Sequence, residues 1–112
     1  MRCFYSQELE LELPSGHPFP MEKFRVSKDL LLDGGILRPE EIVEVRAADV
    51  HLLQRVHERD YIQKIESGLL GRKEQLLLGL PVTPKRYQRS VTEVEATRLA
   101  CHAALAEGVG VD

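Results

Sequence analysis

The residues with the greatest potential for metal chemistry are four histidines and two cysteines. His51 and His57 lie six residues apart, and no carboxylate or thiol accompanies them at ligand spacing. Cys3 and Cys101 lie near opposite ends of the chain and form no CxxC pair, which excludes a zinc knuckle and a secreted disulfide framework. We therefore expect reduced thiols, and we interpret His51 and His57 as exposed or capping residues.

Nucleophilic catalysis finds no support in the spacing of the reactive side chains. Cys101 and His102 are adjacent on an expected helix, so their side chains point about 100° apart and cannot form a nucleophile and base pair. Cys101 falls on an apolar stripe, where we expect it in the core. From these residues alone the chain has no nucleophile, base and orienting group, and no paired catalytic carboxylates.

The segment Leu13–Pro20 is the most unusual local sequence, because prolines flank His17 and Phe19 in a stiff loop. Such a loop can form a pocket wall, and His17 either takes part in chemistry or fixes the turn through a hydrogen bond to the backbone; we favour the second. Lys23 and Arg25 follow near a helix N-terminus, where the helix dipole disfavours cations. They either bind an anion or are simply exposed, and we favour exposure.

The composition is that of an ordinary soluble globular protein. The chain has 112 residues, of which 43% are hydrophobic and 29% charged, and 15 basic side chains oppose 18 acidic ones. A net charge of −3 gives no basic field for nucleic acid, so we expect no nucleic-acid partner. The N-terminus lacks a secretory pattern and no apolar run is long enough for a membrane span, so we expect a cytoplasmic protein without a membrane partner.

Hydrophobic patterning predicts a single α/β domain over residues 1–112. In the first half we expect a strand at 2–5, a long loop at 6–20, a helix from Pro20 to Asp33 and a strand in the second half of 41–45. The helix would turn Met21, Phe24, Leu31 and the stem of Lys28 to one face.

In the second half we expect two short helices, a helical piece at 69–78 within a loop region, and a long helix at 84–107. Asp49 would cap a helix with Val50, Leu53 and Val56 inward, and Asp60 would cap a second with Ile62 and Ile65 inward. The long helix would bury a stripe through Tyr87, Val91, Val94, Cys101 and Leu105. Residues 109–111 begin a further strand, so we expect the sheet to be incomplete within this chain.

The order of several short motifs resembles the N-terminal part of the histone deacetylase superfamily. These motifs are Tyr5-Ser6, Leu13–Lys23, Val56-His57 with Asp60-Tyr61, and Leu80-Pro81 followed by Ser90-Val91. The likeness covers nearly the whole chain and is greatest to bacterial and class IV members, with acetoin-utilisation proteins and acetylpolyamine amidohydrolases among the relatives. It implies the first part of an arginase/deacetylase-like parallel sheet with flanking helices.

The resemblance also implies a function. The family consists of zinc-dependent hydrolases that remove acetyl groups from acetyl-lysine or acetylated amines, but its zinc ligands and tandem histidines match no residue of this chain. We therefore expect no cofactor here, zinc only in a full-length enzyme, and no activity of the 112-residue chain alone. Carried over by position, Tyr5, Ser6, His17, Pro18 and Lys23 would line the substrate tunnel or inner cavity, and 79–84 would form a loop near its rim. Lys23 stands where many relatives have arginine, which removes bidentate anion binding.

Two other classes of protein are weighed against this hypothesis. A non-catalytic interaction module could retain the same N-terminal architecture and would unfold cooperatively as a monomer. Part of a larger domain would instead self-associate through its unpaired strand edges. A dinucleotide-binding unit would need a glycine-rich turn after the first strand, but the segment 6–20 contains only Gly16. We discount the dinucleotide site and retain the module as the alternative.

Overall fold

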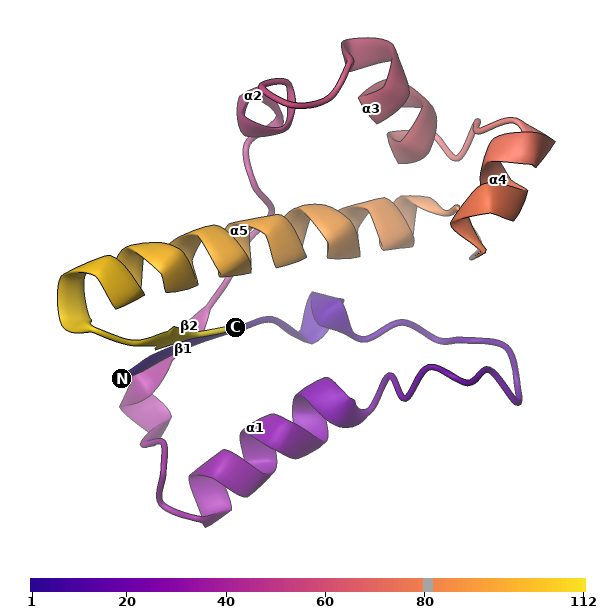
Figure 1. The fold of residues 1–112 in the computed structure, drawn as a ribbon. Coiled ribbons are helices and arrows are strands. Elements are labelled where there is room, and N and C mark those ends of the chain that lie inside the picture. Colours follow the sequence, from indigo (N-terminus) through magenta and orange to yellow (C-terminus); the bar gives the residue numbers. More distant parts are fainter. Residues whose placement is uncertain (80–81) are drawn as a thin grey trace.

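A three-stranded parallel sheet forms the centre of the computed structural model, which describes residues 1–79 and 82–112. The strands are β1 (Arg2–Tyr5), β2 (Ile42–Glu44) and β3 (Gly110–Val111), in the spatial order β2-β1-β3. Cys3 pairs with Ile42 on one side and with Val111 on the other. The predicted α/β class with a parallel sheet is confirmed (Figure 1).

The connection from β1 to β2 contains the long loop and one α-helix. A short 3₁₀ helix, η1 (Gln7–Leu9), follows β1, and α1 (Lys23–Asp33) follows the loop. Helix α1 begins three residues later than predicted, because the Lys23 amide donates to the Pro20 carbonyl and closes a turn there. It ends at Asp33 as expected, and Gly35 provides the positive φ of the reversal (65°).

The side chains predicted to face inward from α1 do so, but they are only partly buried. Met21, Phe24, Lys28 and Leu31 are all half-buried, whereas no residue of α1 is fully buried. Figure 1 shows α1 on the side of the sheet opposite the long helix. A second 3₁₀ helix, η2 (Pro39–Glu41), then leads into β2.

Three short helices, α2 (Val50–Leu53), α3 (Arg59–Glu66) and α4 (Arg72–Leu78), follow β2. Asp49 caps α2 as predicted, through a hydrogen bond from the His51 amide. Only Leu53 points inward, and Val56 is 78% exposed, because α2 is a single turn that ends before Val56. The prediction of Asp60 as a cap is wrong, since Glu58 is the N-cap of α3 and Asp60 lies in its first turn.

The predicted helical piece at 69–78 corresponds to α4, and the left-handed Gly79 ends it. Leu80 and Pro81 lie outside the described residues. They form one of the motifs that carry the resemblance and are part of the predicted rim loop at 79–84.

Helix α5 (Pro84–Glu107) has the predicted bounds, and its predicted buried stripe is correct only in part. Val91 is buried and Tyr87 packs against it, as predicted. The buried residues of α5 are Val91, Thr92, Ala96, Ala100 and Ala103. The stripe through Val94, Cys101 and Leu105 is exposed, and Leu105 reaches 87%. The helix turns its small side chains to the sheet because they permit close approach, and its larger apolar side chains therefore face outward.

The main core lies between α5 and the sheet. Phe4 and Val45 pack there against the alanines of α5. At Gly110 the approach is so close that an added Cβ would lie 2.2 Å from the Ala100 carbonyl oxygen. Glycine is therefore required at this position of β3, where helix and strand backbones meet.

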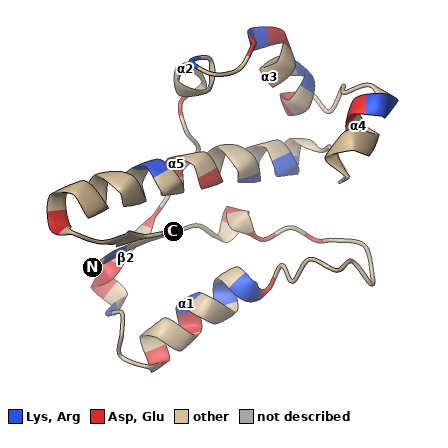
Figure 2. Cartoon of the chain, viewed as in Figure 1, with Lys and Arg blue, Asp and Glu red and all other residues tan. Residues whose placement is uncertain are grey.

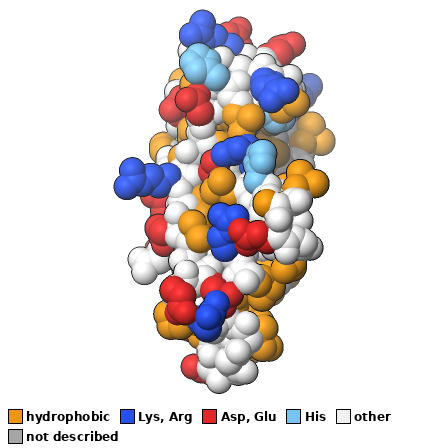
Figure 3. All heavy atoms as spheres, turned by 90° about the vertical axis from the view of Figure 1, so that its left-hand side faces the viewer, with side chains coloured by type: hydrophobic (Ala, Val, Ile, Leu, Met, Phe, Trp, Pro, Cys, Tyr) orange, Lys and Arg blue, Asp and Glu red, His pale blue; other side chains and the backbone are white. Residues whose placement is uncertain are grey.

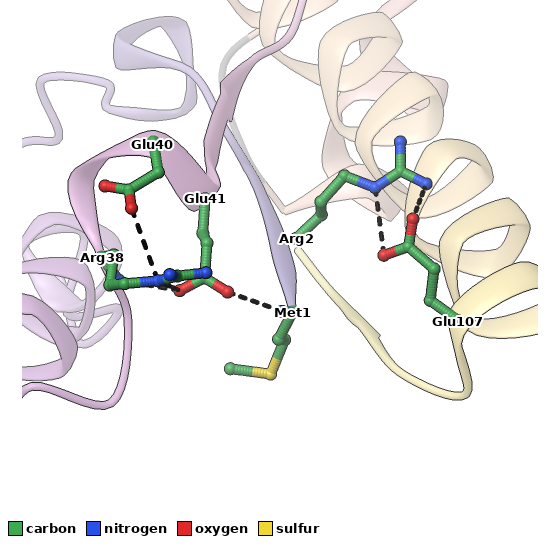
Figure 4. Close-up of polar contacts among 6 residues, drawn as sticks. All are labelled: Met1, Arg2, Arg38, Glu40, Glu41 and Glu107. Atoms are coloured by element: carbon green, nitrogen blue, oxygen red, sulfur yellow. Dashed lines mark hydrogen bonds and ion pairs between the residues drawn. The ribbon is translucent and has the colours of Figure 1, made fainter.

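Ion pairs fasten the amino edge of the sheet (Figure 4). The N-terminal ammonium group contacts Glu41 at 2.6 Å, and Arg2 forms a two-pronged contact with Glu107 at the end of α5. Arg38, the N-cap of η2, contacts Glu40 and Glu41 within it. The contacts of Met1 and Arg2 join the start of β1 to η2, which leads into β2, and to the end of α5, which leads into β3.

Charges of both signs are interspersed over the helices, as Figure 2 shows. Among the described residues, no helix has an apolar stretch sufficient for a membrane span.

Candidate functional site

The carboxyl ends of β1 and β2 lie side by side and open onto a hollow of about 600 Å³. In open parallel sheets, ligands bind just beyond the carboxyl ends of the strands. The hollow is lined by Ser6, Gln7 and Glu8 after β1, by Glu44 to Ala47 at the end of β2, and by Gln88 of α5. It is the part of the described structure where fold geometry places a candidate site.

Glu8 fixes one wall of this hollow. Its carboxylate accepts hydrogen bonds from the Thr92 hydroxyl and the Gln88 amide, both at 3.1 Å. Thr92 is fully buried, and Ser6, 1% exposed, accepts a hydrogen bond from the Glu8 amide at 3.3 Å. Because the Ser6 hydroxyl and the Glu8 carboxylate both accept hydrogen bonds from the protein, this wall is preorganised.

Tyr5 lies at the end of β1 and is buried. Its hydroxyl donates to Glu10 at 3.4 Å, and the Lys28 ammonium group lies 4.6 Å from the centre of its ring. Burial raises the pKa of the phenol, and the neighbouring Glu10 carboxylate raises it further. Tyr5 is therefore a protonated hydrogen-bond donor at neutral pH.

The rest of the loop extends away from the sheet as two limbs (Figure 1). His17 is half-buried in the turn, and its Nδ1 accepts a hydrogen bond from the Phe19 amide at 3.1 Å. This geometry supports the interpretation of His17 as the residue that fixes the turn. Pro18 beside it is exposed.

Lys23 is exposed at the start of α1, as the favoured interpretation predicts. Its ammonium group lies 4.6 Å from the centre of the Phe19 ring and 5.1 Å from that of Phe24. These contacts are cation–π interactions, which recruit a cation to the helix N-terminus without any anion. The five residues predicted from the resemblance thus form two groups, Tyr5-Ser6 at the sheet, and His17 and Pro18 in the loop with Lys23 at the start of α1.

Several residues of this region were not identified from the sequence. Arg89 of α5 donates to the Leu9 carbonyl at 2.8 Å, lies 5.4 Å from the centre of the Phe24 ring, and forms a bidentate pair with Glu93. It joins α5 to both ends of the long loop. Glu8 and Glu10 belong to an acidic run that was visible in the sequence, but their partners are about 80 residues away or on the preceding strand.

The described residues do not form a metal site. Within 1–79 and 82–112, no three His, Cys, Asp or Glu side chains are close enough to hold a metal ion. The hollow at the carboxyl ends of β1 and β2 offers a wall with polar side chains, among them Ser6, Glu8 and Gln88.

Comparison with known proteins locates related sequences. No protein-family model matches the chain. It is 36% identical over 105 residues to an uncharacterized protein of Picosynechococcus sp., covering 94% of this chain. It is 31% identical over 80 residues, 68% of the chain, to the acetoin utilization protein AcuC of Staphylococcus aureus strain MRSA252. The chain is a distant, partial homologue of AcuC.

These relatives are much longer than the chain. The match spans 35% of the Picosynechococcus protein and 21% of AcuC. The homology to AcuC agrees with the predicted resemblance, in which acetoin-utilisation proteins are among the relatives. No described feature tests the roles assigned to Tyr5, Ser6, His17, Pro18 and Lys23, and these remain predictions.

Proposed function

We propose that the chain is the N-terminal part of a histone deacetylase-like hydrolase that removes acetyl groups from acetyl-lysine or acetylated amines. The homology to AcuC over 68% of the chain is the observation that carries this proposal. The proposal includes three further points. The sheet is the first part of an arginase/deacetylase-like sheet, the protein is cytoplasmic, and its substrate is acetylated.

In this proposal the chain supplies a wall of the substrate tunnel and no catalytic residue. The hollow at the carboxyl ends of β1 and β2 supports that role, because Glu8, Thr92 and Gln88 hold the start of the loop in place. Positioning of this kind contributes to catalysis by orienting substrate at residues supplied elsewhere. Zinc, which activates water in such hydrolases, would be held by residues beyond those present here.

A chimera tests the proposal. This chain replaces the matching segment of S. aureus AcuC, and acetate release from acetyl-lysine peptides and acetylated polyamines is measured for AcuC, the chimera and the chain alone, each with zinc. We expect activity from AcuC and the chimera and none from the chain alone. A folded but inactive chimera beside active AcuC would contradict the proposal, and so would stoichiometric zinc binding and acetate release by the chain alone.

Lys23 provides a second readout in the chimera. If this lysine faces an anion in the assembled site, Lys23→Ala lowers activity and Lys23→Arg preserves or raises it, because arginine binds carboxylates bidentately. Lys73→Ala, at an exposed lysine of α4, is the matched control. Equal activity of all three variants would remove Lys23 from the proposed site.

A non-catalytic interaction module is the alternative, and exposed apolar side chains favour it. Leu69, Leu76, Leu77 and Leu105 are each more than 70% exposed. Hydrophobic side chains also reach the surface between charged groups on the face drawn in Figure 3. A module would unfold cooperatively as a monomer, whereas part of a larger domain would associate through its unpaired strand edges.

A further inference from the structure

A second cavity lies away from the sheet edge, between α3 and α5. Its volume is about 230 Å³, and its floor is formed by Leu53, Ile62 and Val91, which are buried and pack together. Tyr87 packs against the same cluster. Cavities lined mainly by apolar side chains with a few convergent polar groups are typical ligand sites.

Polar groups gather at the rim of this apolar floor. Arg86, Ser90 and Tyr61 all line the cavity, and His57 lies beside Tyr61 with ring centres 5.9 Å apart. Within the described part of the chain, neither the Tyr61 hydroxyl nor the Ser90 hydroxyl makes an intramolecular hydrogen bond. The rim therefore offers donors that a ligand can use.

Arg86 distinguishes this cavity from an ordinary packing defect. Three arginines of α5 are half-buried, namely Arg86, Arg89 and Arg98. Arg89 is paired with Glu93 at 2.9 Å and Arg98 with Glu95 at 2.6 Å. Among the described residues, the Arg86 guanidinium has no carboxylate partner and no side-chain hydrogen bond.

The surroundings of Arg86 favour an anion. Partial burial lowers the pKa of its guanidinium, the nearby Arg89 lowers it further, and Glu93, already engaged by Arg89, opposes them. Arg86 also lies in the first turn of a 24-residue helix, where the dipole disfavours a cation and favours a negative charge. An anion bound at Arg86 would stabilise the charged guanidinium and would also interact favourably with the helix dipole.

We propose that this cavity binds a small amphipathic carboxylate, with its hydrocarbon tail on the Leu53, Ile62 and Val91 floor and its carboxylate on Arg86. This inference is independent of the proposed hydrolase function. An arginine can hold a carboxylate through two parallel N–H···O bonds, and Ser90 can donate a third. Glu66 lies near Tyr87 and disfavours an anion there, which directs the carboxylate toward Arg86.

The cavity volume limits the ligand to a short tail. An engineered apolar cavity of about 150 Å³ accommodates benzene, so about 230 Å³ suits a somewhat larger hydrocarbon group. Octanoate is therefore a suitable probe. Octanamide keeps the tail without the charge, and acetate keeps the charge without the tail.

Calorimetric titration of the 112-residue chain tests the proposal, with chemical-shift changes at Val91 and Ile62 as the second readout. We expect saturable octanoate binding, no saturation by acetate, and affinity for octanamide lower by about tenfold or more, because the charged hydrogen bonds are lost. Arg86→Gln should reduce octanoate affinity to the level of octanamide. Arg55→Gln, at an exposed arginine of the same region, should leave it unchanged.

The proposal also predicts the effect of filling the cavity. Ser90 is exposed at the rim, so Ser90→Trp should block octanoate without disturbing the buried floor, and circular dichroism confirms that each variant is folded. Equal binding of octanoate and octanamide, binding unaffected by Arg86→Gln, or octanoate binding without saturation would overturn the proposal. Tighter binding of a peptide ending in leucine with a free C-terminus would assign the cavity to a protein terminus and overturn the small-molecule assignment.

Discussion

Individual polar side chains around the long loop interact mainly with the protein itself. His17 holds a turn, Lys23 contacts two aromatic rings, and Glu8 accepts hydrogen bonds from α5. Each of these contacts helps to hold the loop in place. The hypothesis of a wall without catalytic residues is consistent with that distribution, and single substitutions can test the local geometry.

The two cysteines are expected to differ strongly in reactivity. Cys3 is 6% exposed, and burial, followed by the Asp112 charge, raises the pKa of its thiol, whereas Lys28 acts in the opposite direction. Cys101 is exposed. Because the thiolate is the reactive form, we expect Cys101 to react with a disulfide reagent rapidly and Cys3 only on unfolding.

Stopped-flow measurement of thiol release in the wild type, Cys101→Ser and Cys3→Ser checks this expectation. The fast phase should disappear only in Cys101→Ser. A fast phase that survives in Cys101→Ser would come from Cys3 and would contradict this expectation.

Glu41 is expected to make folding stability dependent on acid pH. The N-terminal ammonium group and Arg38 lower the pKa of this carboxyl group from 4.5 to about 2. A depressed pKa means that ionised Glu41 stabilises the fold above pH 4.5, and that this contribution is lost as the pH falls toward 2. Glu41→Gln should therefore lower the unfolding midpoint in urea at neutral pH, with a difference that disappears near pH 2.

Glu40→Gln is the control for this measurement, because Glu40 contacts Arg38 at a longer distance, 3.5 Å, and both side chains are largely exposed. Its effect should be small at every pH. A constant effect of Glu41→Gln across the whole pH range would contradict the assignment of the stabilisation to its charge.

At the scale of elements, side-chain size decides how α5 meets the sheet. Pro84, the Thr83 cap and Gly108 mark the ends of the helix by local chemistry, and the predicted bounds are correct. The predicted buried face is correct at Val91 but wrong at Val94 and Leu105, because hydrophobic periodicity gives most weight to large apolar side chains. Thr92, Ala96, Ala100 and Ala103 contribute less hydrophobicity but let α5 approach the sheet, where Gly110 and Ala100 meet.

Arg89 is expected to hold the loop against α5. Arg89→Met removes the hydrogen bond to the Leu9 carbonyl while keeping most of the aliphatic stem, so we expect a loss of about 1–2 kcal/mol of unfolding free energy. The change should also increase amide exchange at 8–10 and proteolytic cleavage within 10–22.

Arg98→Met provides the matched control for Arg89→Met. Arg98 is also half-buried and also paired with a glutamate on α5, but it makes no hydrogen bond to the loop. It should cost about 0.5 kcal/mol and leave the exchange at 8–10 unchanged. Equal loop exchange in both variants would contradict an anchoring role for Arg89.

At the scale of the whole molecule, the chain is more extended than a compact domain. Its radius of gyration is 15.7 Å, compared with about 13 Å expected for a compact domain of about 100 residues. β1 has a neighbour on each side, whereas β2 and β3 each have one within the described structure. Both outer strands therefore present an edge, and α1 covers its face of the sheet without a fully buried residue.

These edges lead us to expect self-association of the 112-residue chain. Lysine on a strand edge blocks edge-to-edge pairing, so Val111→Lys should lower the apparent mass in sedimentation velocity across a concentration series. Leu77→Lys tests association through α4 instead, since Leu77 is 89% exposed, and it should have little effect. Monomeric sedimentation with cooperative unfolding of the wild type would favour the interaction module.

The sequence by itself determined the α/β class, the bounds of α5 and the end of α1, because caps, glycines and prolines act on their own neighbourhood. Only the tertiary structure decided which face of α5 is buried, that Cys101 is exposed, and that Arg89, Glu8 and Thr92 hold the loop. Those features join residues about 80 positions apart or depend on how closely a helix approaches a sheet. Neither kind of information is present in local spacing, so hydrophobic periodicity selected the larger side chains where the fold required the smaller ones.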